Sequence, residues 1–328
     1  MVVTRTPLRV SFAGGGTDLS EFYSRDYGAV LSTTIRQYVY VTVKRHGAGF
    51  GEPIRLNYSE TEHVNRIDDV RNDIARECLR FLDVDVPIYV STVADVPAAS
   101  GLGSSSAFAV GLLNALHIWR RERVSAAQLA AEAAHVEIDV LGCPIGKQDH
   151  YAAAYGGINF YRFLQSGGVS IEAQPFDAEG LEEVFSHLML FWTGMTHRAH
   201  DVLAEQTKNT PHRMAELSAL RDQAHSLHQT LQKEFDAEQF GRCLDEGWQV
   251  KRTLASGISN EFIDCLYERA LEAGSLGGKI CGAGGGGVLL LVVCPERRDR
   301  VRKALRELIE IPMTYEPRGS QVLMPQVE

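Results

Sequence analysis

Residues 97–107 read Pro-Ala-Ala-Ser-Gly-Leu-Gly-Ser-Ser-Ser-Ala and stand between a predicted strand and a predicted helix. The strand is Ile88–Ala94, where apolar residues alternate, and the helix is Phe108–Trp119, where they recur at helical spacing. A loop in this position gathers unpaired backbone N–H groups at the positive end of a helix dipole, which favours a bound phosphate. Gly101 and Gly103 leave room for that phosphate because they carry no Cβ.

Three consecutive serines follow the second glycine of this loop. The hydroxyls of Ser104, Ser105 and Ser106 can cap the helix, bind phosphate oxygens or hold Mg²⁺. No Gly-Lys-Ser/Thr triplet closes the loop, so it is not a Walker A motif. Taken alone, the segment is also explained by a well-capped helix that follows a flexible turn.

The composition is that of a folded protein with an acidic balance. The chain has 328 residues, of which 45% are hydrophobic, so it can bury a sizeable core and we expect two domains. The formal net charge of −9 argues against non-specific binding to nucleic acid or to an anionic membrane. Six scattered cysteines, with no Cys-x-x-Cys pair, indicate neither a zinc site nor a disulfide framework. We find no signal sequence and no apolar run of about 18 residues, and we expect a cytoplasmic protein.

The sequence pattern shifts near residues 175–187, where we place a domain boundary. The predicted division is an N-terminal domain over residues 1–180 and a C-terminal domain over residues 181–328. The other main predicted elements are strands Leu8–Ala13, Tyr38–Lys44, Leu188–Thr193 and Val288–Cys294, and helices Val124–Val140 (with Ser125 as N-cap), Met214–Leu231, Asn260–Ala273 and Arg297–Ile309.

Two further glycine clusters lie near the beginning and toward the end of the sequence. Gly282–Gly287 contains Gly-x-Gly-x-x-Gly, but it leads into a strand and opens no helix, which excludes a Rossmann dinucleotide site. Its backbone is instead expected to pass close to another strand or to a phosphate. Gly14–Gly16 follows the first strand and leaves room for a ligand, with Asp18 able to accept hydrogen bonds from hydroxyl groups. Alone, Asp18 is also explained as a turn or cap residue.

Two carboxylates flank the turn Gly142–Gly146. Glu137 lies near the end of the helix before it, and Asp149 follows it. Phosphoryl transfer from ATP needs a hard oxygen ligand for Mg²⁺ and a carboxylate near the accepting hydroxyl. It also needs positive charge near the transferred group, for which Arg9 and Lys147 are candidates. Either acid alone is also explained by a solvated or capping role.

Three segments resemble the motifs of the GHMP kinase superfamily, in the family's order and spread over nearly the whole chain. They are Arg5-Thr-Pro-Leu-Arg-Val-Ser-Phe-Ala-Gly-Gly-Gly-Thr-Asp18, Pro97–Ala107 and Lys279-Ile-Cys-Gly-Ala-Gly-Gly-Gly-Gly287. Within the superfamily, Gly-Gly-Gly-Thr-Asp-Leu at 14–19 and Pro-Ile-Gly-Lys-Gln-Asp at 144–149 are most similar to D-glycero-D-manno-heptose 7-phosphate kinases, which phosphorylate the anomeric hydroxyl. Galactokinases and mevalonate kinases carry Gly-Glu-His in place of Gly14-Gly15-Gly16, and this departure argues against galactose as the substrate.

The resemblance implies an α+β fold of two domains, the first like ribosomal protein S5 domain 2 and the second ferredoxin-like, with ATP and sugar between them. It implies that Asp149 is the catalytic aspartate, that Arg9 stands near the reaction centre, and that Ser105 (or Ser106) and Glu137 hold Mg²⁺. The residues expected at ATP are Pro97, Ser100, Gly101, Leu102, Gly103, Ser104, Ser105, Ser106, Gly284, Gly285 and Gly286. Those expected at the sugar are Gly15, Gly16, Thr17, Lys147 and Asp18, which matches the family's sugar-binding aspartate.

A phosphate already present on the substrate needs a cation of its own, and the motifs name none. Lys251, in a predicted helix, is our candidate for that cation. The alternatives are Arg36, Arg198 and Arg252. Each of these four is also explained as a surface charge. His197 and His200 are three residues apart, but no third metal ligand is evident, and we interpret them as the start of a solvent-facing helix.

The expected function is ATP- and Mg²⁺-dependent phosphorylation of a sugar's anomeric hydroxyl. The expected substrate is D-glycero-D-manno-heptose 7-phosphate, converted to the 1,7-bisphosphate for nucleotide-activated heptose synthesis. The alternatives are a kinase for an unphosphorylated sugar such as L-fucose, and a catalytically silent sensor of sugar and nucleotide. The presence of Ser105, Glu137 and Asp149 counts against the sensor. A sensor does not need both the residues that hold the metal and the aspartate that faces the accepting hydroxyl. We expect a monomer or homodimer with no nucleic-acid or membrane partner.

Overall fold

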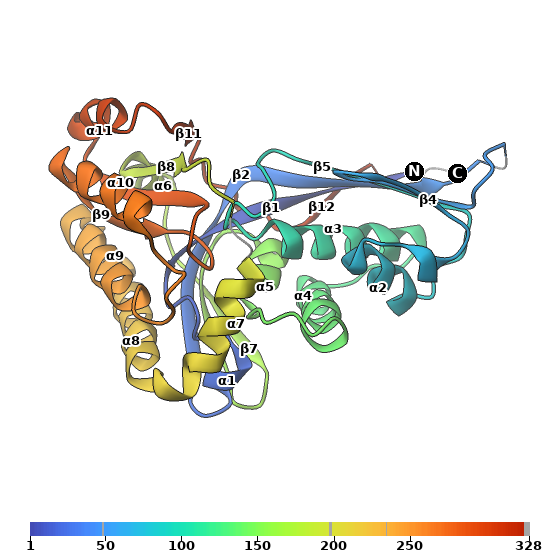
Figure 1. The fold of residues 1–328 in the computed structure, drawn as a ribbon, viewed down its shortest axis with the longest axis horizontal. Helices are drawn as coiled ribbons and strands as arrows, with labels where there is room; N and C mark the ends of the chain where they lie inside the picture. The colour runs from blue at the N-terminus through green and yellow to red at the C-terminus, as the bar shows by residue number, and fades with distance from the viewer. Residues whose placement is uncertain (48, 197–198, 234, 325–328) are drawn as a thin grey trace.

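Two β-sheets with helices packed against them make up the molecule (Figure 1). The computed structural model describes residues 1–47, 49–196, 199–233 and 235–324. The larger sheet runs in the order β12 (Gln321–Met324), β1 (Val2–Ala13), β2 (Gly28–Arg45), β5 (Ile88–Ala94), β3 (Ile54–Asn57) and β4 (Thr61–Val64), with β6 (Ile158–Phe163) beside β2 and β7 (Val169–Ala173) beside β6. The smaller sheet runs in the order β11 (Ile309–Ile311), β8 (Leu188–Trp192), β10 (Val288–Val293) and β9 (Ser275–Ile280).

Eleven α-helices in the described residues connect these strands. They are α1 (Ser20–Tyr23), α2 (Asp73–Phe81), α3 (Ser104–Trp119), α4 (Ala126–Ala134), α5 (Gln148–Tyr155), α6 (Ala178–Ser186), α7 (Ala199–Asn209), α8 (Met214–Leu231), α9 (Ala237–Lys251), α10 (Glu261–Glu272) and α11 (Arg298–Ala304). None of the helices in the described ranges is both long and apolar enough to span a bilayer.

The arrangement is α+β, as expected from the sequence. All strand pairs of the described sheets are antiparallel except β3 with β5, and the helices gather on the sheet faces. Figure 1 shows α2, α3 and α4 along one face of the larger sheet, while α8, α9 and α10 lie with the smaller sheet at the other end of the molecule.

Several predicted elements are confirmed to within a residue or two. The predicted helix 214–231 coincides with α8, and α10 is capped by Asn260, whose side-chain oxygen accepts from the Ile263 N–H at 3.0 Å. Ser125 caps α4 in the same way, accepting from the Gln128 N–H at 3.1 Å. The predicted helix 124–140 changes character at its end, because residues 135–140 form a π-helical turn.

The strand β2 is longer than predicted and ties the larger sheet together. Its first half, from Gly28, pairs with β6, and its second half, to Arg45, pairs with β5. Residues 28–35 are all buried, so the first half lacks the alternation that marks a strand with one solvated face. The sequence pattern therefore indicated only residues 38–44.

The two halves of the chain share one apolar core. Leu8 and Leu116 of the first half belong to the same buried cluster as Leu190 and Leu290 of the smaller sheet. The alternate residues of β8 and β10 face a second cluster with Trp248 and the α10 side chains. The end of the chain returns to the first half, where β12 pairs with β1. The predicted boundary at residue 180 stays a prediction, and the smaller sheet begins just after it, at residue 188.

Candidate active site

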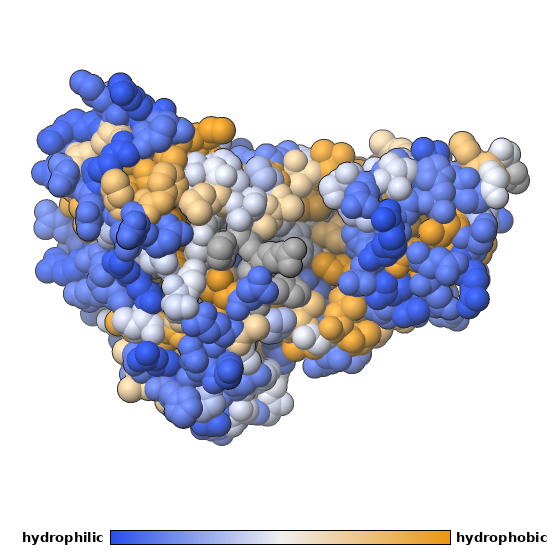
Figure 2. Space-filling view, viewed as in Figure 1, coloured by the Kyte–Doolittle hydropathy of each residue, from blue (hydrophilic) through white to orange (hydrophobic). Residues whose placement is uncertain are grey.

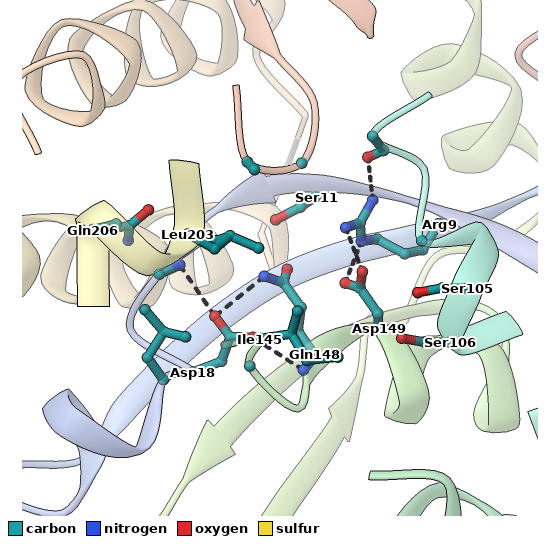
Figure 3. A pocket seen from close by; sticks show the side chains of 18 of the residues that line it. Arg9, Ser11, Asp18, Ser105, Ser106, Ile145, Gln148, Asp149, Leu203 and Gln206 are labelled. Atoms are coloured by element: carbon teal, nitrogen blue, oxygen red, sulfur yellow. Dashed lines mark hydrogen bonds and ion pairs between the residues drawn. The ribbon is translucent and has the colours of Figure 1, made fainter. Parts of the chain in front are cut away.

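A cavity of about 650 Å³ is lined by segments from both halves of the chain (Figure 3). Figure 2 shows that hydrophilic residues cover most of the two ends of the molecule on this face, with apolar residues gathered between them. Polar groups of β1, the serine loop, α5, α7 and α9 meet in the cavity. The three motifs quoted from the sequence, which are far apart along the chain, therefore all contribute residues to one cavity.

The serine loop brings free backbone donors to the cavity. The helix α3 begins at Ser104, and Gly103 before it has no side chain to cap the helix. The first helical hydrogen bond runs from the Ala107 N–H to the Gly103 carbonyl at 2.9 Å, so the N–H groups of residues 104–106 have no helical acceptor. Because Gly103 and the three serines all line the cavity, this end of it is suited to an anion.

The serine loop packs directly on the third motif. The Val288 N–H donates to the Ser100 carbonyl at 3.0 Å. A Cβ on Gly101 would lie only 2.4 Å from the Cys281 carbonyl oxygen, and the φ of Gly101 is +80°. Only glycine fits both conditions, so the close contact between the two motifs depends on this residue.

Arg9 and Asp149 form a two-pronged ion pair at the centre of the cavity. The Arg9 Nε and Nη2 donate to Asp149 Oδ1 and Oδ2, each at 2.7 Å, and Nη1 donates to the Gly101 carbonyl at 2.6 Å. Arg9 is buried, whereas the Asp149 side chain keeps 22% of its surface exposed. The arginine therefore fixes the carboxylate against the start of the serine loop and leaves one side of it open to a ligand.

Glu137 lies behind the serines, on the π-helical turn. Its Oε2 is 2.7 Å from His150 Nε2, and both side chains are buried. Burial acts to raise the pKa of Glu137, but His150 and hydrogen bonds from Ser106 and Ser105 outweigh it, so the pKa is lowered. The carboxyl group is thus kept ionised beside the serine hydroxyls.

Asp18 organises the turn that faces Asp149. Its Oδ1 accepts from the Gly16 N–H at 3.1 Å and from Gln148 Nε2 at 3.2 Å, and its Oδ2 accepts from the Gln148 N–H at 3.1 Å. Burial, followed by the charge of Asp149, raises the pKa of Asp18 above its usual range. Asp18 therefore ties the glycine turn to the start of α5 and also faces the cavity.

Lys251 and Lys279 are two buried lysines near Gly14 and Gly15 of the first motif. Lys251 donates to the Gly282 carbonyl, and Lys279 donates to the Phe12 carbonyl at 3.3 Å. Within the described ranges, neither forms an ion pair with a carboxylate. Burial, together with the charges of Lys279 and Arg9, lowers the pKa of Lys251 to about 7, and burial lowers that of Lys279 to about 8. Of the two, Lys251 lines the cavity.

Some predicted site residues do not line the cavity. Thr17 is buried, and its hydroxyl donates to the Gly14 carbonyl at 2.8 Å. Lys147 donates to the Gly167 carbonyl at 2.9 Å, against Tyr23. The others that lie behind the lining are Pro97, Ser100, Leu102, Glu137, Gly284, Gly285 and Gly286. From the third motif, Gly282 and Ala283 line the cavity instead.

The other cations considered for a substrate phosphate lie elsewhere. Arg36 donates to the Tyr315 carbonyl at 3.1 Å, and Arg252 pairs with Asp264 at 2.6 Å. Arg198 and His197 lie outside the described residues, as does the side chain of His200. Among the described candidates, only Lys251 reaches the cavity.

Sequence reasoning missed five polar side chains of the cavity: Ser11, Gln148, Thr196, Asp201 and Gln206. Ser11 and Gln148 fall inside motifs that the sequence analysis quoted, so their positions could have been singled out. Gln206 lies on α7, which carries no motif; the sequence analysis expected a solvent-facing helix to begin near His197 and His200 but assigned it no functional residue. Only the folded chain brings it to Gly16.

The residues around Ser105 suit a magnesium ion. Mg²⁺ prefers hard oxygen ligands and is commonly held by one or two carboxylates, with water and substrate phosphates completing the shell. An ionised Glu137 beside the hydroxyls of Ser105 and Ser106 offers this chemistry. No group of three His, Cys, Asp or Glu side chains that could hold a metal occurs among the described residues, so a metal here would depend on the nucleotide for further ligands.

Two family models match the chain. The model described as GHMP kinases N terminal domain matches residues 69–157, and the one described as GHMP kinases C terminal matches residues 226–311. Together they cover about half of the chain, and they contain the second and the third of the three motifs, in that order. The chain belongs to the GHMP kinase superfamily. It is a sugar kinase of that family, whose members use ATP as the phosphate donor.

Individual relatives cover nearly the whole chain. D-glycero-alpha-D-manno-heptose 7-phosphate kinase of Campylobacter jejuni is 29% identical over 316 residues, 93% of either protein. L-fucokinase/L-fucose-1-P guanylyltransferase of Bacteroides fragilis is 28% identical over 73% of this chain and 26% of its own length. The crystal structure of a D-glycero-D-manno-heptose 1-phosphate kinase from Bacteroides thetaiotaomicron superposes over 100% of both chains with a TM-score of 0.81 at 25% identity.

Proposed function

We propose that the protein transfers the γ-phosphoryl group of ATP to the anomeric hydroxyl of D-glycero-D-manno-heptose 7-phosphate, giving the 1,7-bisphosphate for nucleotide-activated heptose synthesis. The observation that carries the proposal is the Arg9–Asp149 pair, held between the serine loop and the Gly16–Asp18 turn. The similarity to heptose kinases over nearly the full length supports the substrate class.

Asp149 accepts a hydrogen bond from the anomeric hydroxyl and orients that oxygen toward the γ-phosphorus. An anomeric hydroxyl is more acidic than an ordinary alcohol, so a strong base is not required. Arg9 holds Asp149 in place and adds positive charge beside the transferred group. In phosphoryl transfer such positioning and electrostatic stabilisation supply most of the rate enhancement.

The serine loop binds the triphosphate through its free N–H groups and hydroxyls. Ser105, or Ser106, and Glu137 would hold Mg²⁺, which when bound neutralises phosphate charge during the transfer. Gly101 lets the loop and the third motif approach closely, so the second half of the chain helps to shape the same site.

Lys251 supports a substrate that already carries a phosphate. A buried ammonium group without a carboxylate partner is stabilised when an anion binds beside it. Lys251 is such a group, and its exposed fraction is 6%. A neutral sugar leaves it without a counter-charge, whereas the 7-phosphate supplies one.

The alternative is an anomeric kinase for an unphosphorylated sugar such as L-fucose. The relative from Bacteroides fragilis favours it, because its name includes L-fucokinase. A catalytically silent sensor is disfavoured, because the Arg9–Asp149 pair and the Glu137–serine cluster are both intact.

An ADP-release assay tests the proposal with heptose 7-phosphate, the same heptose without its phosphate, L-fucose and D-galactose. We expect kcat/KM to be highest for heptose 7-phosphate, and ³¹P NMR to place the new phosphate on C1. Equal kcat/KM with and without the 7-phosphate contradicts the assigned substrate and favours the fucose-type kinase. Absence of turnover with every sugar favours the sensor.

A further inference from the structure

Within the part of the chain that the structure describes, three cavity-lining side chains carry a buried polar atom that has no hydrogen-bond partner. The atoms are Ser11 Oγ, Gln148 Oε1 and Gln206 Nε2. Ser11 and Gln206 are 3% and 2% exposed, so neither atom is solvated as an ordinary surface group is. Buried polar groups are normally paired, and unpaired ones that face a cavity indicate a polar ligand.

The three side chains converge around two glycines of the first motif. A Cβ on Gly15 would lie 3.8 Å from Ser11 Oγ, 3.8 Å from Lys251 Nζ and 3.9 Å from Gln148 Nε2. A Cβ on Gly16 would lie 2.3 Å from Gln206 Nε2, so a side chain at this position would displace the Gln206 amide. The glycine at 16, with φ +99°, therefore allows an amide from the second half of the chain to reach this turn.

The hydrogen-bonding capacity of this group matches that of a polyol. Gln148 Nε2 is engaged with Asp18 at 3.2 Å, which leaves its Oε1 as an acceptor. Gln206 Nε2 is a donor, and the Ser11 hydroxyl is both donor and acceptor. Neighbouring hydroxyls of a sugar each donate one hydrogen bond and accept others, so they satisfy all three groups together.

The charges in this part of the cavity argue against the nucleotide as the ligand. The carboxyl groups of Asp18 and Asp149 lie on this side together with one ammonium group, that of Lys251, which the proposed function assigns to the 7-phosphate of the substrate. The free N–H groups of α3 lie beyond Asp149 (Figure 3) and form a better site for a triphosphate, because no carboxylate of the cavity stands among them. Neutral amide and hydroxyl groups beside a carboxylate suit sugar hydroxyls.

We propose that Gln206, together with Ser11 and Gln148, binds the ring hydroxyls of the sugar, and that Gln206 is a specificity-determining residue. This inference rests on the proposed sugar kinase function. It adds a contact from α7, so the second half of the chain takes part in recognising the sugar as well as in shaping the nucleotide site.

Substitution of Gln206 tests the inference through the Michaelis constants. Gln206→Leu removes the amide at similar size, and Gln206→Glu keeps the shape but loses the donor. We expect the KM for heptose 7-phosphate to rise about tenfold or more in both variants, because a sugar hydroxyl that is buried without its hydrogen-bond partner weakens binding. The KM for ATP is expected to stay within about twofold of the wild-type value. The matched control is Gln174→Leu, which removes a buried amide that bonds His228 and does not line the cavity.

Monodeoxy analogues of the heptose 7-phosphate, which lack the hydroxyl at C2, C3 or C4, identify the hydroxyl that forms a hydrogen bond with Gln206. With the wild-type enzyme, one of the three analogues is expected to have a much lower kcat/KM than the parent sugar. With Gln206→Leu, the same analogue and the parent sugar are expected to have similar kcat/KM, because the variant already lacks the hydrogen bond to that hydroxyl. If every deoxy effect is the same in the variant and the wild type, the inference is wrong.

The failure of the inference can be told apart from the failure of the proposed function. If wild-type enzyme turns over heptose 7-phosphate or L-fucose and both Gln206 variants keep its sugar KM, only the inference is contradicted. If the wild type phosphorylates no sugar of the panel, the proposed function is contradicted and the inference falls with it.

Discussion

Asp149 is held by one guanidinium group, and its open side faces the space where the sugar is proposed to bind. Asp149→Asn keeps the shape of the side chain but removes the charge. We expect kcat to fall by about 10²–10⁴-fold, since a positioned acid–base group contributes on that order. Protection against thermal unfolding by ATP should persist, because the serine loop is untouched. The control is Asp222→Asn, an exposed acid on α8; retention of most of the turnover in Asp149→Asn contradicts the assigned role.

Lys251 combines the binding role proposed for it with a cost to stability. Its pKa is lowered to about 7, so the folded protein binds fewer protons than the unfolded chain between pH 7 and the usual lysine value of 10.5. The free energy of unfolding therefore rises with pH across that window, and the cost of burying the charge is largest below about pH 7.

Replacing this lysine separates the two effects. We expect Lys251→Met to raise the free energy of unfolding by about 1–3 kcal/mol at pH 6, with the gain shrinking toward pH 10. The same variant should raise the KM for heptose 7-phosphate at least tenfold. Denaturant unfolding across pH and steady-state kinetics measure the two, with Lys303→Met as an exposed control. A variant that is less stable at pH 6, or has an unchanged KM, contradicts this account.

At the scale of the element, the serine loop depends on a glycine that contacts the opposite half of the chain. Gly101→Ala places a methyl group against the Cys281 carbonyl and also strains the backbone. Gly142→Ala is the matched control, because Gly142 has φ +66° and no atom lies within 4 Å of its Cβ position. We expect the control to lose about 1 kcal/mol and Gly101→Ala to lose at least 1–2 kcal/mol more, with a raised KM for ATP. Equal losses in thermal unfolding indicate that the close contact is unimportant.

The end of α3 carries a buried histidine between two carboxylates. His117 lies 2.7 Å from both Glu122 and Glu132. Burial acts to lower the pKa of His117, but the hydrogen bonds that its ring donates to the carboxylates of Glu132 and Glu122 outweigh it and raise the pKa above 6.5.

The raised pKa makes this contact dependent on pH. For a group whose pKa is higher in the folded state, the stabilisation is complete below about pH 6.5 and is lost as the pH rises through the folded value. We expect His117→Gln to be less stable than the wild type at pH 6, with the difference shrinking toward pH 9. Denaturant titrations at several pH values test this, and a difference that grows with pH contradicts it.

Elements with a complete local signal were predicted well, and those defined by long-range contacts were not. α8 matches its apolar periodicity from end to end, and the caps Ser125 and Asn260 mark true helix starts. The first half of β2 is buried throughout, so it shows no alternation. At the site, motif residues such as Asp149 and Gly101 could be singled out, whereas the partners Arg9–Asp149 and Glu137–His150 became visible only in the folded chain. Gln206 carried no signal, because its neighbours in sequence form no motif.

At the scale of the whole molecule, the final segment completes the first half. Tyr315 bridges to Ile35, and the Glu316 carbonyl accepts from the Thr34 hydroxyl at 2.6 Å. The Glu316 carboxylate accepts from the Tyr38 hydroxyl, and Gly319 packs against the Ala154 carbonyl. Buried contacts of this kind, added to the shared core, predict that both halves unfold together.

Removing the final segment should therefore destabilise the whole protein. We expect truncation after Met313 to abolish the cooperative melting transition or to leave the protein insoluble. The control Leu323→Ser, at a side chain that is 48% exposed on β12, should melt within about 2 °C of the wild type. Calorimetry tests the prediction, and a truncated protein that keeps the wild-type transition contradicts it.

The pairing of β12 with β1 also sets an order of events during synthesis. The ribosome releases β1 about 300 residues before β12 is made, so the nascent chain carries an unprotected hydrogen-bonding edge over that interval. Until β12 is synthesised, that edge is available to chaperones or to the same edge of another unfinished chain.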